Sequence, residues 1–134
     1  MKSVEEIKNK METGFENDFF GHGVEDLKYA LPFEEVKQYL ATEVSETEWE
    51  EKHRLSTDEK VKEEMLNYLP FAWEKANNER GLSADRSIRH FIAWAWLIDD
   101  ELCEKLENMY KTNYAEYGKP ILAYLNEVLG YKSK

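Results

Sequence analysis

Residues 83–97, SADRSIRHFIAWAWL, constrain the fold of this chain more than any other segment. Their main apolar face carries Ile88, Phe91, Ile92 and Ala95 at helical spacing. Trp94 and Leu97 extend this surface around the axis and Trp96 falls on a different side, so the segment is apolar nearly all round after Arg89. Such a helix must be surrounded by other helices, which predicts a buried central helix near 83–97.

Helix start and stop signals divide the rest of the chain. Ser3, Ser45 and Ser56 are each followed three positions later by glutamate, which is the capping-box pattern, and glycines follow several apolar periodic segments. We predict helices at about 3–13, 24–30, 32–42, 45–53, 57–79 (with a break or bend near Pro70), 83–97, 99–113 and 118–129. No segment shows the alternation typical of a strand. The predicted fold class is all-α, a compact single-domain bundle of about six to eight helices over residues 1–134.

The charge is distributed unevenly along the 134 residues. The formal net charge is −10, and 42% of the residues are hydrophobic, which is enough to fill a core. Residues 1–70 hold 18 acids and 9 bases, a net charge of −9, whereas the aromatic-rich residues 71–134 hold 10 acids and 9 bases, a net charge of −1. The first half is therefore acidic, and the second half is nearly neutral.

This charge and the absence of targeting signals limit the partners and the compartment. An acidic surface repels nucleic-acid phosphates and anionic membranes, so direct binding to either is not expected. The longest apolar run, 91–98, is too short to cross a bilayer. One cysteine, Cys103, permits no internal disulfide, and the N-terminus lacks the apolar run of a signal peptide. We expect a soluble, cytoplasmic protein.

Motifs for metals, cofactors and nucleophilic catalysis are not convincing. Glu50 and His53 form half of a di-iron pattern without its second half, and the three histidines lack the spacing of zinc ligands. No glycine-rich phosphate loop is present. Cys103 follows an acidic cluster at core spacing, which indicates a buried thiol. We expect no metal, no cofactor and no catalytic residue.

Two groups of residues remain as candidate sites. The first is an acidic face that could attach to a basic surface of a protein partner; its members are Glu43, Glu46, Glu48, Glu50, Glu51, Asp58 and Glu59. A solvated, purely solubilising surface is the plainer interpretation of the same residues. The second group is Arg86, Arg89 and His90, in the first turns of helix 83–97, where the helix is expected to reach water.

These groups support three functions. The first is a non-enzymatic binding protein that competes with nucleic acid for the basic groove of its partner. The second is a small helical enzyme with a pocket beside His90. The third is a structural or assembly subunit, because residues 110–131 contain several tyrosines and tyrosine is common at protein interfaces.

The segment GLSADRSIRHFIAWAWLIDDEL, followed by NYAEYGKPIL, resembles small uncharacterised proteins encoded by phages and other mobile elements. The resemblance covers about residues 81–125 and carries no catalytic motif. It implies a protein that acts on host machinery, in the manner of an anti-restriction or anti-CRISPR inhibitor.

Overall fold

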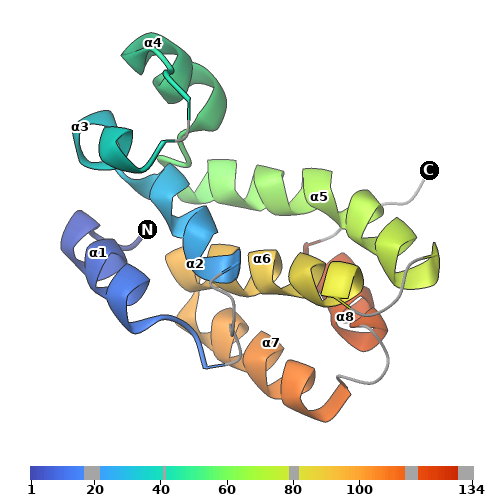
Figure 1. Ribbon diagram of the computed structural model, residues 1–134. Helices are drawn as coiled ribbons and strands as arrows, with labels where there is room; N and C mark the ends of the chain where they lie inside the picture. The colour runs from blue at the N-terminus through green and yellow to red at the C-terminus, as the bar shows by residue number, and fades with distance from the viewer. Residues whose placement is uncertain (17–21, 41, 79–81, 114–117, 130–134) are drawn as a thin grey trace.

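A computed structural model describes residues 1–16, 22–40, 42–78, 82–113 and 118–129 (Figure 1). The helices are α1 (Val4–Thr13), α2 (His22–Leu27), α3 (Phe33–Val36), α4 (Glu46–Glu48), α5 (Asp58–Asn78), α6 (Leu82–Ile98), α7 (Asp100–Asn113) and α8 (Lys119–Leu129). Three short turns complete them: the 3₁₀ turns η1 (Lys28–Ala30) and η2 (Lys37–Tyr39) and the π-helical turn η3 (Trp49–His53). No strand occurs within these ranges, so the predicted all-α fold class is confirmed.

Helix α6 lies at the centre of the molecule, as its sequence predicts. It packs against α2, α5 and α7, and Figure 1 shows it between α5 and α7. Phe91 is completely buried and Trp94 is 4% exposed, whereas Trp96 is only partly buried. The prediction of a buried central helix is confirmed.

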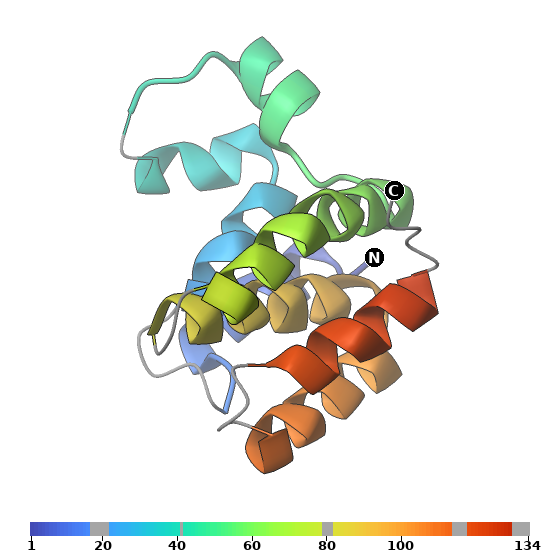
Figure 2. The ribbon, with the colours of Figure 1, turned by 90° about the vertical axis from the view of Figure 1, so that its right-hand side faces the viewer.

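The remaining long helices surround α6 to form the helical body, which comprises α1, α2 and α5–α8. Helix α8 packs against α5 and α7, and α1 packs against α2 (Figure 2). Ile121, Leu122 and Leu125 on the inner face of α8 are completely buried. Each helix therefore buries one apolar stripe, and α6 buries most of its circumference.

The helix boundaries follow local capping chemistry. Ser3 and Glu6 form a complete capping box at α1, and Ser45 accepts a hydrogen bond from the backbone N–H of Glu48. At α5 the capping hydroxyl belongs to Thr57, which accepts from the N–H of Lys60, so the prediction at Ser56 is wrong by one residue. Helix α5 continues through the exposed Pro70 without the break allowed for in the prediction; a proline there removes one backbone hydrogen bond.

Residues 33–40 and 42–53, with α3, η2, α4 and η3, form a projecting unit that stands away from the helical body (Figures 1 and 2). Its anchor is Trp49, which is 1% exposed and stacks on Tyr29 with ring centroids 5.4 Å apart. The indole Nε1–H of Trp49 also donates to the carbonyl of Leu31 at 3.4 Å. Beyond the unit, the N–H of Leu55 donates to the carbonyl of Tyr29 at 2.7 Å, which returns the chain to the body.

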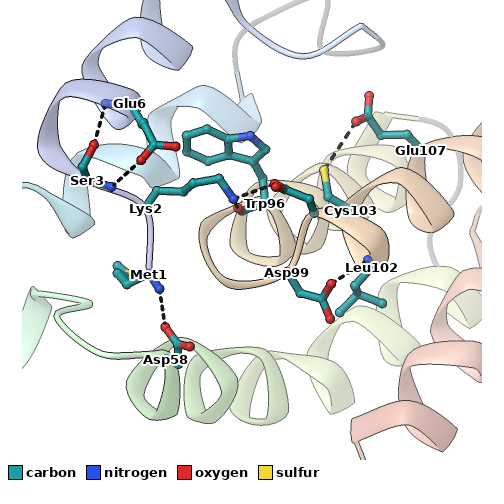
Figure 3. A network of polar contacts seen from close by, with 11 residues as sticks. Met1, Lys2, Ser3, Glu6, Asp58, Trp96, Asp99, Leu102, Cys103 and Glu107 are labelled. Carbon is teal, nitrogen blue, oxygen red and sulfur yellow. Dashed lines mark hydrogen bonds and ion pairs between the residues drawn. The ribbon is translucent and has the colours of Figure 1, made fainter.

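The N-terminal segment closes the C-terminal end of α6 (Figure 3). The backbone N–H of Lys2 donates to the carbonyl of Leu97 at 3.0 Å, and its ammonium donates to the carbonyl of Trp96 at 2.7 Å. A cation is favoured at this end of a helix because unpaired carbonyls give it a partial negative charge. Asp99 caps the start of α7 by accepting from the N–H of Leu102 at 3.1 Å.

Candidate functional site

A cleft of about 460 Å³ lies where η3 and the residues after it face the helical body. Its walls are formed by Asp26 and Tyr29 from α2 and η1, by residues 51–55, by Lys60, Glu63, Glu64, Asn67 and Tyr68 from α5, and by His90 and Trp94 from α6. This volume falls within the range of small-ligand sites in proteins. The cleft therefore joins the projecting unit, the first half of α5 and the middle of α6 in one concave surface.

His90 is held in the cleft by Asp26. The imidazole Nδ1 lies against the carboxylate oxygen Oδ2 of Asp26, and the two side chains are 22% and 12% exposed. When Nδ1–H donates to Asp26, the neutral imidazole carries a lone pair on Nε2. Within the described part of the chain, no hydrogen bond is given to Nε2, and the His90 side chain is partly exposed. In this tautomer His90 offers the cleft an oriented acceptor nitrogen.

Aromatic rings fix the orientation of His90. Its imidazole stacks on Trp94, with centroids 5.7 Å apart and an interplanar angle of 25°. Tyr68 meets both rings edge-on, with centroids 5.3 Å from His90 and 5.4 Å from Trp94. These offset-stacked and edge-to-face arrangements are the favoured geometries for aromatic pairs, and they stabilise the observed orientation of His90.

The opposite wall comes from the π-helical turn η3. Such turns are rare and frequently occur at functional sites. Here the turn places the exposed His53 near Tyr29 and Trp49, with ring centroids 6.4 Å and 5.8 Å away. A second histidine therefore lines the cleft, although no local pattern in the sequence connects it with His90.

Several charges around the cleft are already paired. Arg54 donates to both carboxylate oxygens of Glu50, at 3.0 Å and 3.1 Å, and Lys52 lies 3.9 Å from Glu48. Asp26 is paired with His90. Within the described ranges, no ion pair is given for four other lining residues: Glu51, Glu63, Glu64 and Lys60. Among the lining residues that have no ion pair in the described ranges, three acids and one base carry a net charge of −2.

The predicted acidic face falls on the projecting unit and on the start of α5. Glu43, Glu46 and Glu59 are exposed, and the described part of the structure gives them no ion pair. Three others have partners: Glu48 with Lys52, Glu50 with Arg54, and Asp58 with the α-amino group of Met1 at 2.9 Å. Glu51 lines the cleft. The seven residues therefore divide into free acids, paired acids and one cleft acid.

The second predicted group is only partly brought together. Arg89 is 4% exposed, and its guanidinium donates to the hydroxyl of Tyr110 on α7 at 2.8 Å. The expectation that Arg89 reaches water is wrong, because its position on α6 turns it toward α7 while His90 turns toward α5. The side chain of Arg86 lies outside the described residues. Of the two described members, Arg89 and His90, only His90 is among the residues that line the cleft.

The buried thiol predicted at Cys103 is confirmed. Cys103 is 3% exposed and donates to the carboxylate of Glu107 at 3.4 Å. Burial, with the neighbouring Glu107, raises the pKa of the thiol to about 12. A thiol held in its protonated form cannot act as a nucleophile near neutral pH.

No helix in the described ranges is long and apolar enough to cross a membrane. The same ranges contain no group of three or more histidine, cysteine, aspartate or glutamate side chains placed to share a metal ion. Glu50, one member of the Glu50–His53 pair, is instead paired with Arg54.

Comparisons of the chain with protein-family models, with curated proteins and with solved structures found no match.

Sequence reasoning missed most of the cleft. It identified His90, but not its partner Asp26, which lies 64 positions earlier in the chain. It also missed Tyr68, because an aromatic residue at helical spacing on α5 is the expected signal of core packing. The one local signal was the pair of histidine and aromatic residues at 90 and 94, four positions apart on the same helix face.

Proposed function

We propose that the protein is a non-enzymatic binding protein that attaches through its acidic face to a basic surface of a protein partner. The observation that carries this proposal is the position of Glu43, Glu46 and Glu59, which are exposed and are given no ion pair within the described residues. Two of them lie on a unit that projects from the helical body (Figure 1). A projecting acidic surface is sterically suited to enter a basic groove.

Competition with nucleic acid is the specific form of this function that we favour. Exposed carboxylates carry the same sign of charge as nucleic-acid phosphates, so they suit the same kind of basic groove. The resemblance to phage and mobile-element proteins supports the same direction. The partner would then be a nucleic-acid-binding host protein, inhibited in the anti-restriction or anti-CRISPR manner.

The test is a triple charge reversal, Glu43→Lys with Glu46→Lys and Glu59→Lys. These three residues have no recorded partner to lose, and none of them lines the cleft. The partner is first captured from a host extract by the parent protein and identified, and its affinity for each variant is then measured at two salt concentrations. We expect the triple variant to lose at least about tenfold in affinity and most of the salt dependence, because exposed charges are screened over about 8–10 Å.

The matched control carries the same charge change on the opposite part of the molecule. Glu101→Lys, Glu104→Lys and Glu127→Lys alter exposed acids of α7 and α8 and should leave affinity nearly unchanged. Equal losses in both triple variants would show that net charge, and not the acidic face, governs binding. Unchanged binding by the first variant would refute the proposal.

General acid–base catalysis is a second candidate function, favoured by the pairing of His90 with Asp26 in a cleft. An oriented imidazole with an open Nε2 is the arrangement of a general base. None of the described side chains that line the cleft is a serine, threonine or cysteine, so His90 would activate water or a substrate group. His90→Asn would then abolish turnover of a substrate while leaving partner affinity intact.

A role as an assembly subunit gains less support. The large apolar side chains recorded as exposed are Met1, Tyr39, Phe71 and Val128. They belong to four separate segments of the chain. A few exposed apolar residues are normal on soluble proteins, so these four are no specific evidence for an assembly interface.

A further inference from the structure

The cleft has the charge to receive a cation. Glu51, Glu63 and Glu64 line it without ion pairs among the described residues, and Lys60 is the corresponding uncommitted base. The other two basic residues at the cleft, Lys52 and Arg54, face glutamates of the projecting unit. A cationic group that enters the cleft would therefore meet a surplus of carboxylates.

The cleft also has the shape and the acceptors for a planar cation. The rings of Tyr68, His90 and Trp94 pack together on one side of the cleft, and because Trp94 is 4% exposed, the partly exposed Tyr68 and His90 are the ring surfaces that a ligand can reach. A guanidinium group is flat, stacks on aromatic faces and presents five N–H donors in a rigid fork. The available acceptors are the carboxylates of Glu63 and Glu64 and the Nε2 lone pair of His90, which Asp26 orients. A lysine ammonium, as a compact point charge, would use the aromatic wall less fully.

We propose that this cleft binds the guanidinium group of an arginine side chain. Its volume of about 460 Å³ exceeds what one side chain fills, so flanking peptide backbone can enter as well. The idea that the basic partner presents this arginine rests on the proposed function. The chemistry of the cleft is independent of that function. Binding would hold the projecting unit and α5 together around the ligand, since each contributes one wall.

The direct experiment is a titration with blocked tripeptides, acetyl-Gly-Arg-Gly-amide and its lysine and citrulline counterparts. Citrulline has the shape of arginine without the charge. Binding is followed by the NMR signals of the His90 imidazole, assigned with a His90→Gln variant. For a single side chain we expect a dissociation constant in about the millimolar range, weakened about tenfold by citrulline, since a desolvated cation on an aromatic face contributes at about that level.

Variants on α5 locate the binding site. Glu63→Gln with Glu64→Gln removes two exposed charges at little risk to the fold and should weaken arginine binding about three- to tenfold. The matched control, Glu101→Gln with Glu104→Gln, removes two exposed acids from α7 and should have no effect.

The outcomes separate this inference from the proposed function. Equal binding of the arginine and citrulline peptides, or equal losses in the α5 and α7 variants, would overturn the inference even if the acidic-face reversal still abolished partner binding. Preferential binding of acetyl-Gly-Glu-Gly-amide would overturn it as well, and would favour an anionic substrate for His90. Arginine binding that survives while partner binding ignores the acidic-face reversal would support the cleft and refute the proposed function.

Discussion

The helical body and the projecting unit reach stability by different means. In the body, α5–α8 are 21, 17, 14 and 11 residues long and pack side by side with continuous apolar stripes. In the projecting unit, α3 and α4 have four and three residues. Helices that short are not stable by themselves, because the entropy lost in forming the first turn exceeds the free energy gained from its hydrogen bonds. The unit is held to the body by the buried Val36 and Trp49, with Phe33, Leu40 and Val44 partly buried beside them.

This difference matters for the cleft, which takes one wall from each region. The wall formed by α5 and α6 belongs to two long helices that pack against each other and contribute to the core. The wall formed by η3 depends on the stacking of Trp49 on Tyr29 and on the return of the chain at Leu55. Local opening should therefore begin in the projecting unit, because it has few buried apolar contacts. Ligand binding at the cleft would oppose that opening.

The largest expected effect comes from truncation in the body. Phe91→Ala removes a completely buried ring that packs edge-on against Tyr68 and Trp94. We expect a loss of about 3–5 kcal/mol in the free energy of unfolding, from transfer energy and the cavity left behind. Urea unfolding followed by circular dichroism measures it. A loss below about 1 kcal/mol would show that α6 is not the centre of the core.

A similar truncation in the projecting unit should have a smaller and more local effect. Trp49→Ala removes the anchor of η3, its stack on Tyr29 and its hydrogen bond to Leu31. We expect a loss of about 2–4 kcal/mol, because short turns can rearrange around the lost side chain. Amide hydrogen exchange should accelerate mainly in residues 29–55. Uniform acceleration over α5–α8 would show that the two regions unfold together.

The success of the sequence predictions follows the same division. Helices of the body were predicted within a few residues, because a stripe repeated over several turns is a strong local signal. The predicted helix 32–42 is instead α3 and η2, which end at Tyr39, and the predicted helix 45–53 is α4 followed by a π-helical turn. Where a segment has one or two turns, tertiary anchors and not periodicity decide its geometry.

The candidate site was harder to predict than the fold. His90 stood out locally, but its pairing with Asp26 depends on how α2 crosses α6, and no local pattern records that crossing. Arg89 shows the limit most clearly. Neighbouring residues on a helix point about 100° apart, so a single position separates the cleft from the α7 interface. A polar residue in an apolar helix can face water or a buried partner, and Arg89 faces Tyr110.

The thiol of Cys103 reports on the body independently of the projecting unit. Because its pKa is raised from 9.0 to about 12, its stabilising contribution is complete below about pH 9 and is lost as the pH rises through about 12. At pH 8 we expect iodoacetamide to react about a hundredfold or more slowly with the native protein than with urea-unfolded protein. Trp49→Ala should preserve this protection, whereas Phe91→Ala should weaken it. Equal labelling of native and unfolded protein would contradict the buried position on α7.

The smallest expected effect on stability is that of the acidic-face reversal, and its smallness is informative. Glu43, Glu46 and Glu59 are exposed and have no recorded ion pair, so their replacement by lysine should change the free energy of unfolding by no more than about 0.5 kcal/mol. Glu50→Lys should cost more, because it removes both hydrogen bonds to Arg54 and places two cations together. Urea unfolding of both variants at low and high salt measures this contrast. If the triple reversal destabilises as much as Glu50→Lys, its acids contribute to folding, and a loss of partner binding could not be assigned to the surface alone. If the triple reversal leaves stability unchanged, these acids do not contribute to folding, and any loss of partner binding can be assigned to the interface.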